Sequence, residues 1–109
     1  MNSVTEPFES ALRELCRRFR VERLYVFGSA ADGRFEASRS DLDFLVTLEA
    51  QTPGEYAANY LDLAQAMEKL FQRRVDLVTE RSIRNPYFRE AVNATRQLLY
   101  DRRDEKAAA

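Results

Sequence analysis

The sequence predicts one small domain that mixes helices and strands, of the α/β or α+β class. Its 109 residues are enough for one compact domain and too few for two. Three short runs of β-branched and aromatic residues alternate with segments in which apolar residues recur at helical spacing. Because three short strands cannot close a barrel, we expect an open sheet covered by helices.

The first helix and the first strand are indicated by a change of periodicity near residue 20. Apolar residues recur at helical spacing over residues 5–18, after a capping-box pattern with Ser3 or Thr5 as the N-cap. Residues 21–27 are rich in β-branched and aromatic side chains, which predicts a strand. A short helix is expected to begin at Ser29, directly after this strand.

The middle of the chain predicts a strand, a long helix and a further strand. Residues 41–48 have apolar side chains on both faces, which is typical of an interior strand. The longest helix is expected over residues 53–72, because Thr52 and Glu55 have the spacing of a capping box and a proline follows the cap. Residues 74–78 form another short apolar run and predict the third strand.

The last predicted element is a helix that begins at the Asn85-Pro86 pair. Proline at the first helical position favours this start, and Leu98 or Leu99 is expected on the inner face. The sequence that follows is charged and then rich in alanine. We therefore expect residues 101–109 to form a disordered charged tail.

Composition excludes several kinds of site. There is no histidine, so histidine-based catalytic triads and histidine-ligated zinc sites are ruled out. The single cysteine, Cys16, lies on the apolar stripe of the first helix and is interpreted as a packing residue. The 17 basic and 18 acidic residues argue against an extended nucleic-acid surface. No apolar run approaches the ~20 residues of a membrane span, so we expect a cytoplasmic protein.

The most informative residues are a glycine-serine turn after the first strand and two carboxylates on the second. Asp41 and Asp43 are spaced i and i+2, so in a strand they point to one face, about 6–7 Å apart along the chain. Such like charges repel unless a cation lies between them, and oxygen ligands suit Mg²⁺ or Mn²⁺ better than zinc. Gly28 allows close approach of a phosphate, with its N–H group and that of Ser29 as donors. Together these features predict phosphoryl or nucleotidyl transfer.

Each of these features also has a structural interpretation when taken alone. Glycine-serine is a common turn dipeptide, and the D-x-D pattern is frequent in loops. Asp76, the only acid in the third strand, could be a buried hydrogen-bonding group. Arg34 and Arg39 could contact a triphosphate or only solvate the loop between the two motifs. The joint occurrence of the motifs at the ends of strands favours the functional interpretation.

The two motifs together resemble the signature of a known enzyme family. Residues 26–29 (VFGS) and 40–46 (SDLDFLV) are similar to the pattern of the minimal nucleotidyltransferases, in the DNA polymerase beta-like nucleotidyltransferase superfamily. Eleven residues separate the serine from the first aspartate, one more than usual. Residues 83–90 (IRNPYFRE) also resemble the closing helix of these proteins. The resemblance implies the nucleotidyltransferase fold, with a small mixed sheet, over residues 1–100.

The resemblance also implies roles for individual residues. Asp41, Asp43 and Asp76 are expected to be catalytic and to bind two Mg²⁺ ions. The nucleotide is expected to be ATP, and its binding residues are expected to be Gly28, Ser29, Arg39 and Ser40.

Relatives of this kind imply a partner. Minimal nucleotidyltransferases are commonly paired with a helical HEPN toxin, and as the antitoxin they add AMP to a tyrosine of that toxin. We expect this activity and a hetero-oligomer with the toxin. Two alternatives stay open: transfer to a small-molecule hydroxyl with a separate helical subunit, and a non-catalytic antitoxin that neutralises its partner by binding.

Overall fold

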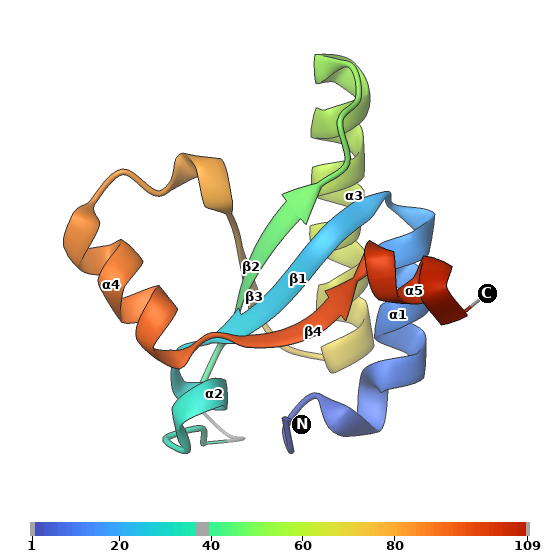
Figure 1. Cartoon of the computed structure of the whole chain (residues 1–109). Helices are drawn as coiled ribbons and strands as arrows, with labels where there is room; N and C mark the ends of the chain where they lie inside the picture. The colour runs from blue at the N-terminus through green and yellow to red at the C-terminus, as the bar shows by residue number, and fades with distance from the viewer. Residues whose placement is uncertain (1, 37–39, 109) are drawn as a thin grey trace.

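The structure, a computed structural model, describes residues 2–36 and 40–108 and shows an open sheet with helices on both faces (Figure 1). The expected α/β class with a small mixed sheet is confirmed. None of the helices in these ranges is long and apolar enough to cross a membrane. In chain order the elements are the 3-10 helix η1 (Glu6–Phe8), α1 (Glu9–Arg18), β1 (Val21–Phe27), α2 (Ser29–Asp32), β2 (Leu42–Leu48), α3 (Pro53–Phe71), β3 (Val75–Thr79), the 3-10 helix η2 (Glu80–Ser82), α4 (Pro86–Thr95), β4 (Gln97–Asp101) and α5 (Arg102–Ala108).

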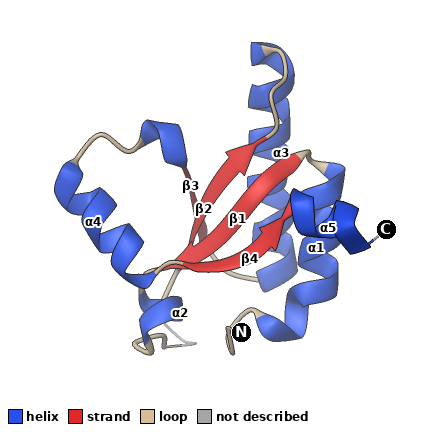
Figure 2. Cartoon of the chain, in the orientation of Figure 1, coloured by secondary structure: helices blue, strands red, loops and turns tan. Residues whose placement is uncertain are grey.

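Four strands form the sheet, in the order β3-β2-β1-β4 (Figure 2). β1 runs antiparallel to both β2 and β4, whereas β2 runs parallel to β3. A parallel pair needs a long crossover connection, and α3 provides it. As a result the first residues of β2 and β3 lie side by side, next to the last residues of β1.

The two faces of the sheet are covered differently. The larger core lies between the sheet and helices α1 and α3, and its fully buried side chains include Leu24, Phe44 and Met67. In Figure 1, α4 stands on the other side of the sheet from α1 and α3. A smaller cluster lies on that side and consists of Phe27, Leu45, Ile83 and Val92. Because side chains alternate along a strand, Asp43 points to the same side as Leu45.

Two predicted helix starts are confirmed. At the start of α3, the Glu55 N–H donates to Thr52 Oγ1 at 3.3 Å and the Thr52 N–H donates to Glu55 Oε1 at 3.2 Å. At the start of α4, the Asn85 side chain accepts hydrogen bonds from the N–H groups of Tyr87 and Phe88. These caps satisfy backbone donors that have no partner within a helix.

The predicted cap of the first helix is wrong. Neither Ser3 nor Thr5 caps it with its side chain; instead Asn2 Oδ1 accepts from the N–H groups of Val4 and Thr5, each at 3.0 Å. An asparagine side chain readily bonds the backbone two and three residues further on. The regular helix therefore begins at Glu9, after the short turn η1.

The end of the last predicted helix is also wrong, because a strand was missed. α4 ends at Thr95, Arg96 has an extended backbone with ψ of 139°, and Leu98 and Leu99 lie in β4. A short apolar run fits a strand or a buried helix equally well by periodicity. Here β4 pairs with the edge of β1, which gives backbone groups of both strands hydrogen-bond partners.

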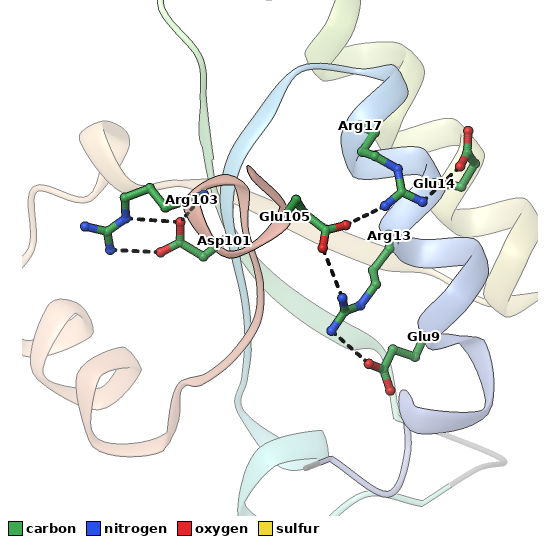
Figure 3. A network of polar contacts seen from close by, with 7 residues as sticks. All are labelled: Glu9, Arg13, Glu14, Arg17, Asp101, Arg103 and Glu105. Carbon is green, nitrogen blue, oxygen red and sulfur yellow. Dashed lines mark hydrogen bonds and ion pairs between the residues drawn. The ribbon is translucent and has the colours of Figure 1, made fainter. Parts of the chain in front are cut away.

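Residues 102–108 form a helix, so the expectation of a disordered tail is also wrong for them. Asp101, which ends β4, is buried and its carboxylate accepts two hydrogen bonds from the Arg103 side chain. Glu105 of α5 lies between Arg13 and Arg17 of α1 and forms an ion pair with each (Figure 3). The sequence of this segment is too polar to predict a docked helix, and these tertiary contacts anchor it.

Candidate functional site

Two of the predicted catalytic acids are direct neighbours in the sheet. Asp43 of β2 and Asp76 of β3 are register partners in the parallel pair. Adjacent strands are about 4.8 Å apart, and register partners point to the same face. The two carboxylates, 33 positions apart in the sequence, therefore lie together at the end of the sheet where β2 and β3 begin.

The pKa of Asp43 is affected by this arrangement. Its pKa is raised to about 6, first by burial and then by the negative charges of Asp76 and Asp41. Within the described ranges, none of these three carboxylates has a hydrogen-bond or ion-pair partner. Carboxylates that lack a counterion can serve as ligands of a hard divalent cation.

Asp41 completes the set only in part. It lies directly before β2 rather than within it, and it is exposed. Across residues 2–36 and 40–108, no three acidic side chains are close enough to form a ready-made metal cluster. The structure thus brings Asp43 and Asp76 together, with Asp41 near enough to affect the Asp43 carboxylate but not converged on it.

The glycine-serine turn lies against the Asp43 carboxylate. Gly28 has a φ of 73° and a ψ of −148°, a region that is essentially restricted to glycine. A Cβ atom placed on Gly28 would be only 2.6 Å from Asp43 Oδ2, so no other residue fits without displacing the acid. Gly28 therefore allows two things at once: an unusual backbone conformation and close approach to the Asp43 side chain.

One of the two predicted phosphate donors already has a hydrogen-bond partner within the protein. α2 begins at Ser29, as predicted, but the Gly28 N–H already donates to Thr95 Oγ1 at 3.1 Å. Thr95 is the last residue of α4, and no sequence signal had associated it with the site. The first N–H groups of a helix have no partner within it, so Ser29, with its N–H and its hydroxyl, is the better candidate donor.

The remaining predicted nucleotide-binding residues precede β2 in the sequence. Ser40 Oγ accepts from the Glu36 N–H at 2.9 Å, and the Ser40 carbonyl accepts from Arg73 Nη1 at 3.0 Å. Arg34 forms an ion pair with Asp32, its Nε and Asp32 Oδ2 being 2.8 Å apart, and does not point to the acids as a free cation. Arg39 lies outside the described residues, so its predicted role is not addressed by the structure.

Comparison with known proteins places the site in a family. The nucleotidyltransferase domain matches residues 9–99 of this chain. A Methanocaldococcus jannaschii protein described as a proposed protein adenylyltransferase is 28% identical over 92 residues, which are 84% of this chain and 90% of that protein. A solved structure of a proposed minimal nucleotidyltransferase is 35% identical and has a TM-score of 0.63, with 89% of this chain and 95% of that chain covered.

A further solved structure has the same fold at lower identity. It contains a tri-AMPylated Shewanella oneidensis HEPN toxin in complex with an MNT antitoxin. It is 21% identical to this chain, with a TM-score of 0.62, and the match covers 94% of this chain and 78% of the other. With the in-register acids, the glycine-serine turn and the match over residues 9–99, the conclusion is that this chain belongs to the nucleotidyltransferase domain family, among its minimal members.

Proposed function

We propose that this protein transfers AMP from ATP to a tyrosine hydroxyl of a HEPN-family toxin and thereby acts as its antitoxin. The observation that carries the catalytic part is the register pair of Asp43 and Asp76, with Gly28 in contact with the Asp43 carboxylate. The proposed protein adenylyltransferase and the AMPylated toxin complex found by comparison support the choice of AMP and of a protein acceptor.

Asp43 and Asp76, with Asp41 nearby, would hold a pair of magnesium ions. Asp43 and Asp76 present unpaired carboxylate oxygens side by side, and the pKa of Asp43 is raised first by burial and then by the negative charges of Asp76 and Asp41. Asp41 would complete the ligand set from its exposed position before β2. When bound, Mg²⁺ would neutralise triphosphate charge and lower the pKa of the acceptor hydroxyl.

The protein's own contribution is orientation and proton transfer. Ser29 and Ser40, with Arg39, would bind the phosphates so that pyrophosphate leaves in line with the incoming hydroxyl. Asp76 is exposed, so an acceptor hydroxyl can reach it from solvent, and it would accept the proton as the new phosphorus–oxygen bond forms. Most of the rate then comes from placing the reacting groups correctly, since such a site makes no covalent intermediate with the protein.

Incubation with ATP, Mg²⁺ and the cognate HEPN-family protein, followed by intact-mass measurement of both chains, tests the proposal. We expect the partner to gain one or more AMP units, at a tyrosine that fragmentation identifies. Asp43→Asn and Asp76→Asn should abolish the gain, whereas Asp62→Asn, an exposed acid on α3, should not. Inhibition of the toxin with no mass change would instead support neutralisation by binding, and AMP on an added small alcohol alone would support a small-molecule acceptor.

A further inference from the structure

Three side chains that are far from residues 28–32 in the sequence form hydrogen bonds with the backbone of Gly28 and α2. The Gly28 N–H donates to Thr95 Oγ1 at 3.1 Å. The Ala30 carbonyl accepts from Asn2 Nδ2 at 2.9 Å, and the Ala31 carbonyl accepts from Gln97 Nε2 at 3.2 Å. The hydrogen bonds reach this short segment from the N-terminus, from the end of α4 and from the start of β4.

Asn2 uses both ends of its side-chain amide in this arrangement. The residue is only 5% exposed, and its Oδ1 accepts from the N–H groups of Val4 and Thr5. Its Nδ2 donates to the Ala30 carbonyl and, at 2.8 Å, to Gln97 Oε1. A buried asparagine with all of these partners fixes the position of whatever it contacts. It also lies outside residues 9–99, the part that matches the family.

Thr95 joins the turn to α4. Its hydroxyl donates to the Ala91 carbonyl one helical turn earlier, at 3.4 Å, which leaves a lone pair for the Gly28 N–H. The Thr95 hydroxyl therefore accepts from the Gly28 N–H and donates to the Ala91 carbonyl through the same oxygen atom. Gln97 follows two residues later at the start of β4, so one short stretch supplies two of the three contacts.

We infer that Asn2, Thr95 and Gln97 are positioning residues that hold the Gly28–Ser29 turn in place for the triphosphate. The inference rests on the proposed function, in which Ser29 binds phosphate beside Asp43. A four-residue helix has little internal support, and the Gly28 conformation persists only if its surroundings determine it. Such preorganisation determines how accurately the triphosphate is positioned relative to the acidic residues.

The first experiment compares steady-state constants for ATP. Thr95→Val removes the hydroxyl at nearly constant volume, and Asn2→Ser retains an oxygen that can cap the N-terminal turn but removes the amide donors. We expect each to raise KM for ATP about tenfold with a smaller change in kcat, since a factor of ten, 1.4 kcal/mol, is the size of one net hydrogen bond. Thr95→Ser should recover most of the affinity.

A matched control separates positioning from general stability. Thr52→Ala removes the cap of α3, which is far along the chain from the Gly28 turn. Like the other variants, it lowers stability through the loss of a hydrogen bond between a side chain and the backbone. We expect KM for ATP to stay at the wild-type value in this variant. If Thr95→Val and Asn2→Ser lower stability as Thr52→Ala does and leave KM unchanged, the inference is overturned.

A second readout does not depend on turnover. Amide hydrogen exchange of Gly28, followed by NMR, should be slow in the wild type and in Thr95→Ser and at least tenfold faster in Thr95→Val. If the wild type proves inactive, the proposed function fails, yet faster Gly28 exchange in Thr95→Val still supports the positioning contact. Unchanged Gly28 exchange in Thr95→Val contradicts it.

Discussion

Substitution of the glycine beside Asp43 tests the geometry of the site most directly. In Gly28→Ala the new Cβ would be 2.6 Å from Asp43 Oδ2, whereas ordinary contact begins at 3.4 Å, so the two atoms must separate by about 0.8 Å. The φ of 73° adds backbone strain of about 1–3 kcal/mol. We expect a loss in unfolding free energy of about 2–3 kcal/mol, and a fall in transfer rate of about 100-fold because the carboxylate is displaced.

The other two glycines provide the controls for this experiment. Gly33 also has a positive φ, 86°, but a Cβ there would meet nothing within 4 Å. Gly33→Ala should therefore lower the unfolding free energy through backbone strain alone, by about 1–2 kcal/mol. Gly54 lies in α3 with open space around it, and Gly54→Ala should stabilise the protein by roughly 0.5–1 kcal/mol.

Urea unfolding gives the three stability changes, and the AMP-transfer assay gives the rates. The reasoning on Asp43 is refuted if Gly28→Ala loses no more stability than Gly33→Ala and transfers AMP at the wild-type rate.

Three further predictions follow from charges and caps. The pKa of Asp43 is raised from 3.8 to about 6, so the folded state binds more protons than the unfolded state, and the unfolding free energy should fall as the pH rises from 4 to 6. Asp43→Asn should remove this fall. Without Mg²⁺ at pH 8, this variant should be more stable than the wild type by about 1 kcal/mol, a value reduced for the partial exposure of Asp43. Glu105→Gln removes the ion pairs with Arg13 and Arg17, so it should lower the unfolding free energy by up to ~1 kcal/mol and speed amide exchange in α5. Glu14 is exposed on α1, and Glu14→Gln should change neither quantity. Thr52→Ala should lower the unfolding free energy by about 1 kcal/mol in urea titrations.

The parts of the fold that the sequence predicts are those with local causes. The capping box at Thr52 and Glu55, the Asn85 cap and the acid spacing of Asp41 and Asp43 each depend on residues a few positions apart. Local chemistry of this kind acts in the same way in any fold, so it can be recognised before the structure is known.

The parts that it does not predict have distant causes. β4 is a strand because β1 offers a free edge, and α5 docks because Glu105 meets two arginines of α1. Within the site, neither the contact of Thr95 with Gly28 nor the contact of Asn2 with Ala30 has any signal in the spacing of residues. Such contacts join segments tens of residues apart, and only the folded chain brings them together.

The meeting of Asp43 and Asp76 depends on strand register, which explains the importance of α3. A slip of β3 by one residue would place Leu77 opposite Asp43 and turn Asp76 toward the core face. Two side chains of α3 oppose such a slip: Tyr60 donates its hydroxyl to the Leu77 carbonyl, and Glu68 accepts from the Val75 N–H at 3.2 Å. These bonds also occupy backbone groups on the outer edge of β3, which limits pairing with another strand. The long helix therefore does more than connect two parallel strands, because its side chains fix the register on which the acidic pair depends.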